Sequence, residues 1–187
     1  MFKALTAAQL AGALAPLGVS ARLARRLQNA VLRDGCVPAA LPEVSPALLD
    51  RVRRATLIPA LETLDKVVSP SDGFVRYVFR GDGPDAFEAV SIPLLHRPND
   101  AKVVVCVSSQ IGCSLGCAFC ITGRMGHRRN LAAWEIVDQV ARIRADSPYP
   151  VRGVVFMGMG EPMLNYDAVM QAAAILSEPC GMAIAGK

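Results

Sequence analysis

The chain has 187 residues, of which 52% are hydrophobic, and a formal net charge of +4. This length suits one domain, or a small domain together with part of another. No apolar run is long enough to span a bilayer, and no signal peptide opens the chain. These features argue against a membrane protein and against a secreted disulfide scaffold, so we expect a soluble, cytoplasmic protein.

The positive charge is concentrated at the N-terminal end. Residues 1–60 carry eight basic and three acidic side chains, a net charge of +5 against +4 for the whole chain. The basic residues are Lys3, Arg22, Arg25, Arg26, Arg33, Arg51, Arg53 and Arg54. Such a basic module can contact the phosphate groups of a nucleic acid, but a solvated helix face has the same composition. Charge alone leaves both interpretations open.

Residues 1–60 are predicted to form three short helices. Thr6 can cap the first, which should run to about Leu14, and Ser20 can cap the second. Gly35 is a stop signal for the second helix. Ser45-Pro46 is a start signal for the third, because proline is favoured at the first helical position. Sequence alone therefore indicates a small basic helical module.

Residues 61–98 change to a β-rich composition. Apolar runs over residues 75–79 and 87–92 lie on either side of the turn signal Gly81-Asp82-Gly83-Pro84. A β-hairpin connector is therefore predicted. Glu88 lies in the second run, where an exposed strand carboxylate is the ordinary interpretation.

From residue 99 to residue 187 the pattern alternates between strands and helices. Buried parallel strands are predicted over residues 102–107 and 151–157, each followed by a helix, over residues 134–145 and 167–176. This alternation predicts an α/β fold. In parallel α/β folds ligands bind beyond the carboxyl ends of the strands, which is where two motifs lie.

The first motif is a CxxxCxxC run made by Cys113, Cys117 and Cys120. Three thiolates can hold a cubane iron–sulfur cluster and leave one iron without a protein ligand, whereas a ferredoxin supplies four cysteines. A zinc site of three cysteines and His127 is an alternative, although zinc sites usually come as paired knuckles. Phe119 suits a residue that shields such a cluster, or an ordinary core residue.

The second motif is Gly158-Met159-Gly160-Glu161-Pro162, after the second predicted strand. Glycines let the backbone approach a ligand closely, and a glutamate can accept a hydrogen bond from an ammonium group. Alone, the motif is equally a turn from strand to helix. Cys106 ends the first predicted strand, where a free cysteine is usually a small apolar filler.

Taken in order, these motifs resemble the RlmN/Cfr family of radical S-adenosylmethionine (SAM) RNA methyltransferases. The resemblance rests on the run from Cys106 to Cys113 (CVSSQIGC), on the three cysteines, on Arg129-Asn130-Leu131 and on the GMGEP run, and it extends from the N-terminal helices to about Leu176. It implies methylation of an adenine carbon in ribosomal RNA, and in transfer RNA for the RlmN branch, through a methyl-cysteine intermediate. It further implies a [4Fe-4S] cluster, SAM, and an electron donor such as flavodoxin or ferredoxin.

The resemblance also implies a fold and residue roles. The fold would be a partial radical-SAM (βα) barrel over residues 99–187, preceded by a basic helical RNA-binding-like domain over 1–60 and a hairpin connector over 61–98. The implied roles are cluster ligation by Cys113, Cys117 and Cys120, SAM contact by Gly160 and Glu161, proton acceptance by Glu88, and resolution of an RNA–protein adduct by Cys106. Cys106 would form a transient disulfide with a cysteine absent from this chain.

Several points stay open in the sequence. The methyl-carrying cysteine of the family lies beyond Lys187, so we expect a C-terminally truncated fragment that is not competent alone. A non-catalytic RNA-binding remnant and a radical-SAM enzyme of another reaction type are the alternatives. Arg124, Arg128 and Arg129 either meet RNA phosphate or solubilise their loop. Cys36, Cys180 and His127 receive no role.

Overall fold

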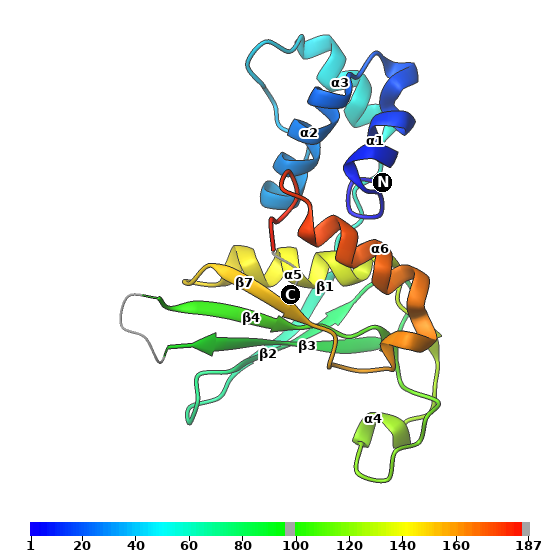
Figure 1. The fold of residues 1–187 in the computed structure, drawn as a ribbon, viewed down its shortest axis with the longest axis vertical. Coiled ribbons are helices and arrows are strands. Elements are labelled where there is room, and N and C mark those ends of the chain that lie inside the picture. The colour runs from blue at the N-terminus through cyan, green and yellow to red at the C-terminus, as the bar shows by residue number, and fades with distance from the viewer. Residues whose placement is uncertain (96–99, 185–187) are drawn as a thin grey trace.

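The computed structural model describes residues 1–95 and 100–184. Figure 1 shows a group of helices at one end of the molecule, a twisted sheet in its other half, and two helices between them. The predicted α/β class is confirmed. The boundary predicted between residues 98 and 99 lies outside the described residues, as does the predicted end of the barrel region at residue 187.

In the described part, the N-terminal module contains the predicted helices α1 (Ala7–Leu14), α2 (Ala21–Asp34) and α3 (Pro46–Ala55), with a short 3-10 helix, η1 (Ala15–Leu17). The predicted caps are present at the first two, because the hydroxyls of Thr6 and Ser20 accept hydrogen bonds from backbone amides three residues on. The third helix begins with proline, and Ser45 makes no side-chain cap. Gly35 ends α2 in a left-handed conformation.

Apolar side chains of these helices and of the segments next to them form a core of their own. It contains Phe2, Leu10, Leu14, Val19, Leu23, Leu27, Val31, Val37, Leu49 and Val52. The arginines of the module lie outside this core, whereas the Lys3 side chain is buried, with only 2% exposure. Lys3 Nζ lies 2.7 Å from Asp138 Oδ1 and donates to the Pro59 carbonyl at 2.8 Å. Lys3 therefore joins the module to the rest of the fold and does not contribute to its basic surface.

The described residues form one five-stranded sheet in the order β1-β2-β3-β4-β7. Its strands are β1 (Glu62–Val68), β2 (Val75–Arg80), β3 (Ala86–Leu94), β4 (Lys102–Cys106) and β7 (Val151–Val155). Each neighbouring pair is antiparallel except β4 and β7, which are parallel. The predicted hairpin is confirmed as β2 and β3, extended by β1. Because β3 pairs with β4, the connector strands and the predicted barrel strands share a sheet.

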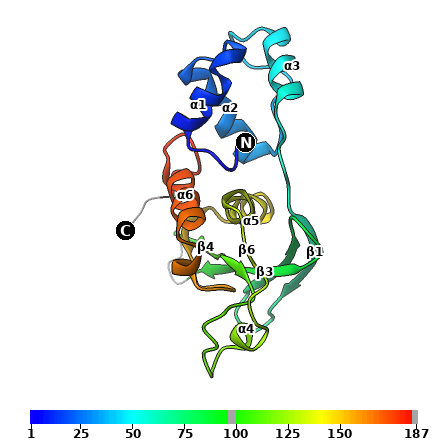
Figure 2. The same ribbon diagram turned by 90° about the vertical axis from the view of Figure 1, so that its right-hand side faces the viewer.

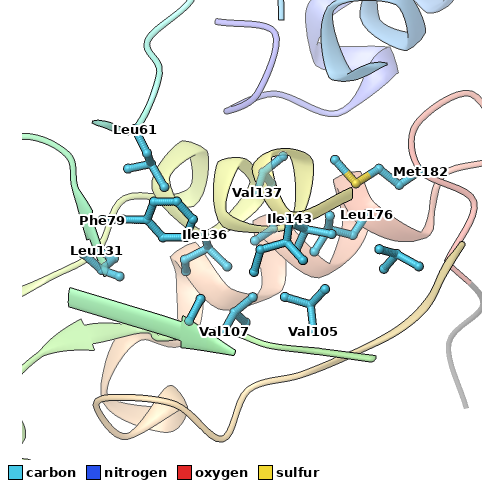
Figure 3. Close-up of a cluster of buried hydrophobic side chains, with 14 of the residues drawn as sticks. Leu61, Phe79, Val105, Val107, Leu131, Ile136, Val137, Ile143, Leu176 and Met182 are labelled. Carbon is cyan, nitrogen blue, oxygen red and sulfur yellow. The ribbon is translucent and has the colours of Figure 1, made fainter. Parts of the chain in front are cut away.

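Helices α5 (Ala133–Asp146) and α6 (Tyr166–Ser177) cover one face of this sheet, between the strands and the helical module (Figure 2). Figure 3 shows Val105 and Val107 pointing toward Ile136 and Ile143 of α5. Phe79, fully buried, stacks on Tyr77 with ring centroids 5.7 Å apart. Side chains alternate across a strand, so the residues between the buried ones face the opposite, uncovered side. We call this side the open face.

The remaining elements lie beyond the carboxyl ends of β4 and β7. They are the two-stranded ribbon of β5 (Gln110–Ile111) and β6 (Arg129–Asn130), the single turn α4 (Ile121–Arg124) and the 3-10 helix η2 (Pro162–Asn165). In both views α4 projects at the end of the molecule opposite the helical module. Across residues 1–95 and 100–184, no helix is long and apolar enough to cross a bilayer.

Candidate functional site

Glu88 and Cys106 lie on the open face of the sheet. Val90 of β3 is the partner of Cys106 in β4, and Glu88 stands two residues before Val90 on the same face. Glu88 and Cys106 are therefore diagonal neighbours, which typically lie about 7–8 Å apart, with their Cβ atoms somewhat closer. The sheet register thus places both predicted residues on one surface.

Different contacts hold these two side chains. Arg76 Nη1 donates to Glu88 Oε1 at 3.0 Å, and the Glu88 carboxylate remains 43% exposed. The Glu88 carbonyl accepts a hydrogen bond from Ser108 Oγ. Burial raises the pKa of the half-buried Cys106 thiol, although the backbone amide of Met157 opposes the shift. Cys106 is therefore a protonated thiol at neutral pH, and it becomes a nucleophile only after losing its proton.

The three motif cysteines lie in a loop over residues 112–128, which we call the cluster loop. Cys113 is buried at its base, with 8% exposure, and Cys117 and Cys120 are half-buried nearer its tip. The loop is closed where Gly112 meets Gly126, because a Cβ on Gly112 would lie 1.7 Å from the Gly126 carbonyl oxygen. Gly112 also has a φ of +73°, which favours glycine.

The cluster loop has the donor chemistry of an iron–sulfur site. Hydrogen bonds from the backbone amide of Gly123 and then from Thr122 lower the pKa of Cys120, against the effect of desolvation, so its thiolate is favoured. In the described residues, no three His, Cys, Asp or Glu side chains are gathered into a group that could hold a metal ion. The three thiols are thus of the number, spacing and chemistry that a cluster needs, but their sulfur atoms are not close enough together in this structure to bind one. His127 is exposed and contacts Asn130 Oδ1 at 3.2 Å.

The GMGEP run is fastened beside this loop by backbone hydrogen bonds. Met159 N donates to Ser108 Oγ at 2.9 Å, and Glu161 N donates to Gln110 Oε1 at 2.8 Å. Gly160 has a φ of +95°, and a Cβ there would lie 2.5 Å from Gln110 Cβ, so only glycine fits. The Glu161 carboxylate is half-buried and accepts from Met163 N at 3.0 Å, which leaves it further acceptor capacity.

The segment Ser108–Ser109–Gln110 links these parts, and reasoning from sequence missed this role. Ser108 exchanges two hydrogen bonds with the side chain of Gln139 on α5. Gln110 Nε2 donates to Asn130 Oδ1 of β6 at 2.7 Å, while its other side-chain atom holds the GMGEP run. The available signal was a run of three polar residues directly after an apolar strand. All three are buried in the structure, where the side chains of Ser108 and Gln110 find hydrogen-bond partners and the Ser109 hydroxyl has none among the described residues.

The loop arginines divide between internal and exposed positions. Arg129 makes a bidentate ion pair with the fully buried Glu135, with N–O distances of 2.7 and 2.8 Å. Arg128 pairs with Asp85 at 2.9 Å and is 58% exposed, and Arg124 donates to the Ala118 carbonyl. Arg129 is thus a structural partner of Glu135, a role that the sequence did not predict.

Large apolar side chains are exposed around the site. Phe119 is 92% exposed, so the prediction that it could be an ordinary core residue is wrong. Leu115, Ile121 and Met125 of the cluster loop, and Met157 and Met163 near the GMGEP run, are exposed as well. The carboxyl end of the sheet therefore presents apolar surface beside its cysteines and its acidic residue.

All six cysteines lie in the described part of the chain, and each is a free thiol. The transient disulfide predicted for Cys106 would use a cysteine absent from this chain, and nothing in this structure supports it. Cys180 is half-buried, and its sulfur lies 3.8 Å from Glu178 Oε2. Cys36 is exposed at the end of α2.

Comparison with known proteins gives concordant matches. The model of the radical SAM superfamily matches residues 107–186. A probable RNA methyltransferase from Myxococcus xanthus (strain DK1622) is 43% identical over 189 residues, which cover 99% of this chain and 51% of that protein. The dual-specificity RNA methyltransferase RlmN from Syntrophobacter fumaroxidans (strain DSM 10017 / MPOB) is 46% identical, over 67% of this chain and 36% of its own.

A solved structure agrees with these sequence matches. The crystal structure of a radical SAM methyltransferase from Sphaerobacter thermophilus superposes with a TM-score of 0.80 at 33% identity, covering 98% of this chain and 53% of that one. The chain spans about half the length of the curated relatives that it matches over nearly all of its own length.

Proposed function

We propose that this chain, which carries a radical SAM domain and is homologous to RlmN-type RNA methyltransferases, is the cluster- and SAM-binding part of an enzyme that methylates an adenine carbon in RNA. Ribosomal RNA is the first substrate class, and transfer RNA is the second. The observation that carries the proposal is the convergence of the cluster loop, the GMGEP run, Cys106 and Glu88 around the carboxyl end of β4.

The residues at this end would divide the binding of the cofactors. Cys113, Cys117 and Cys120 would hold a [4Fe-4S] cluster, and the backbone at Gly160 and the carboxylate of Glu161 would bind the amino group of SAM. When bound, the cluster and SAM supply one-electron reductive chemistry that side chains cannot provide. Gln110 sets the spacing between the two binding parts, since its side chain contacts both the ribbon below the cluster loop and Glu161.

Glu88 and Cys106 would act on the open face, where the nucleotide would lie. In this proposal Glu88 accepts a proton, and Cys106 is the thiol that ends a covalent link between protein and RNA. Arg76 holds one oxygen of Glu88, and the partial exposure of the carboxylate leaves it open to a substrate. A base must come within hydrogen-bond reach of its proton, so the bound nucleotide must approach β3.

Partners and location follow from this chemistry. A one-electron reduction needs a donor, for which flavodoxin and ferredoxin are the proposed classes, and RNA substrates of this kind place the enzyme in the cytoplasm. Because the chain spans about half the length of its relatives, the proposal assigns it cofactor binding and assigns methyl transfer to a longer protein.

The test is anaerobic reconstitution with iron and sulfide, followed by iron counting and electron paramagnetic resonance (EPR) with and without SAM. We expect about four irons per chain and a spectrum that SAM perturbs. Cys117→Ser should remove the iron, while Cys36→Ser, in the helical module, should leave it in place. Zinc binding, iron binding that survives Cys117→Ser, or a spectrum unchanged by SAM would refute the proposal.

A second candidate is an RNA-binding protein without SAM chemistry, which the exposed arginines Arg22, Arg25, Arg51 and Arg54 favour. The helices that carry them lie across the α5–α6 layer from the sheet, away from the cluster loop (Figure 2). This candidate predicts RNA binding that weakens steeply with salt and an absence of cluster loading. A radical-SAM enzyme of another reaction type would load the cluster and respond to SAM but leave RNA unchanged.

A further inference from the structure

The return arm of the cluster loop is fastened to α5 by an unusually complete set of contacts on one carboxylate. Both oxygens of the fully buried Glu135 accept from the guanidinium of Arg129, which lies on β6 directly after the loop. The hydrogen bonds and charge of Glu135 raise the pKa of Arg129, so its guanidinium stays protonated. Bidentate pairs of this kind fix orientation as well as distance.

The same carboxylate holds the turn between β2 and β3. The Asp82 amide donates to Glu135 Oε1 at 3.1 Å. The neighbouring Gly81 leaves room for this contact, since a Cβ there would lie 2.0 Å from Glu135 Oε1. From this turn Asp85 also pairs with Arg128, the residue before Arg129. The turn leads directly into β3, the strand that carries Glu88.

Other buried polar groups on α5 serve different segments. Asp138 binds Lys3 and the Leu61 amide, and Gln139 binds Ser108. Glu135 therefore differs from its neighbours on the helix because its partners lie in the cluster loop's return arm and in the β2–β3 turn. It also accepts from the Ala132 amide at 2.8 Å as the third residue of α5.

We propose that Glu135 is a positioning residue that, through Arg129 and Asp82, sets the base of the cluster loop relative to the strand carrying Glu88. We call Glu135, Arg129 and Asp82 the Glu135 clamp. Loss of these contacts would release β6 from α5. Because Arg129 of β6 pairs with Ile111 of β5, the release would reach the base of the cluster loop at Gly112 and Cys113. The inference depends on the proposed function only for the identity of the group that the cluster loop binds.

The variant that isolates this role is Glu135→Gln. Glutamine in the third helical position still caps α5, so the helix start is preserved, while the charged fork to Arg129 is lost. The matched control is Asp138→Asn, which replaces another buried carboxylate one turn along the same helix, in an ion pair that is more deeply buried than that of Glu135. Arg128→Gln removes the exposed pair with Asp85, does not alter either residue of the buried pair, and serves as the milder variant.

The readout is the alkylation rate of each cysteine in the cluster-free protein, resolved by mass spectrometry. We expect Glu135→Gln to raise the rate at Cys113 about tenfold, because a hydrogen-bonded charge pair is lost. Arg128→Gln should raise it less, and Asp138→Asn should leave it within about twofold of the wild type. Cys36 is exposed in every variant and normalises the rates, while Cys106 reports general opening of the sheet.

Two results would overturn the inference. One is an equal rise at Cys106 and Cys113, which would mean that Glu135 only stabilises the fold. The other is a larger rise at Cys113 in Asp138→Asn than in Glu135→Gln, which would mean that reactivity follows global stability. The alkylation assay needs no iron. If the wild-type chain fails to load a cluster, the proposed function is therefore refuted, while the inference about the Glu135 clamp can still be tested. If the cluster loads in the wild type, an iron content per chain that is lower in Glu135→Gln but unchanged in the other two variants gives independent support.

Discussion

The helical module and the carboxyl end of the sheet are stabilised by different interactions. The module has an apolar core of its own, two of its helices begin at capping hydroxyls, and α2 ends at Gly35. At the carboxyl end of the sheet, large apolar side chains are exposed while serines, glutamines and a glutamate are buried. Order in the module therefore comes from apolar burial, and order at the site comes from directed hydrogen bonds.

This difference teaches where substitutions will matter. An apolar core tolerates changes that conserve volume, because burial is not directional. A buried polar network does not, because each lost partner leaves another group unsatisfied. Four expected outcomes test the contrast, beginning with the largest.

The largest effect is expected in the cluster loop. Cys120→Ala removes one of three thiolates, so iron content after reconstitution should fall from about four per chain to background. Cys180→Ala, a half-buried cysteine outside the loop, should leave the iron content unchanged. Iron and sulfide counting decides between the outcomes, and equal iron in the two variants would mean that the loop is not the cluster site.

The next effect concerns the contact between the two regions. Asp138→Ala leaves the Lys3 ammonium buried without a counter-ion, which should lower the free energy of unfolding by about 3–5 kcal/mol. Arg142→Ala removes a partner that is 43% exposed and 3.5 Å from Asp138, and should cost less than about 1 kcal/mol. Urea unfolding at pH 7 measures both. Similar losses in the two variants would show that the buried pair contributes no more to stability than the exposed one.

A smaller effect separates two glycines with similar backbone angles. Gly83 and Gly160 have φ values of +91° and +95°, so alanine strains both positions. A Cβ on Gly83 meets nothing within 4 Å, whereas one on Gly160 meets Gln110. Gly160→Ala should therefore cost about 1–3 kcal/mol more than Gly83→Ala, through overpacking. Thermal or urea unfolding of the two variants compares these costs, and equal losses would argue against a tight fit at Gly160.

The smallest effect depends on pH. Hydrogen bonds from Lys66 and then from Tyr77 lower the pKa of Asp146, which is 43% exposed. A carboxylate with a lowered folded-state pKa stabilises the fold above its unfolded pKa of about 4, and this contribution is lost as the pH falls through the folded-state value. Asp146→Asn should cost less than about 1 kcal/mol at pH 7. Urea unfolding near pH 3 should show a smaller difference from the wild type, and a difference that grows there would contradict the assignment.

Much of the fold could be predicted from sequence because it follows periodic patterns. The helical starts at Thr6 and Ser20, the stop at Gly35 and the hairpin around Gly81 were all legible, since each reflects a local backbone preference. Strand β1 was harder to predict, because all its residues are exposed and no alternation marks it.

The site could be predicted in its residues but not in its connections. The three cysteines and the GMGEP run are local sequence motifs, so they could be identified from the sequence. The pairing of Lys3 with Asp138 joins distant parts of the chain, and that of Arg129 with Glu135 joins β6 to the start of α5 six residues later; neither follows a helix or strand period. For the same reason Arg129 was read from sequence only as a contact for RNA phosphate or as a solubilising residue.

The contacts of the N-terminal module also determine when it can dock during synthesis. The Ala7 amide donates to Glu178, and Gln171 donates to the Ala4 carbonyl, so the partners of the first helix are among the last described residues. At about 5–20 residues per second, roughly 10–30 seconds of translation separate Ala7 from Glu178. The module has its own core and can fold during that interval. Its docking is therefore a late, long-range step, and slowing the ribosome should delay it without delaying the folding of the helices.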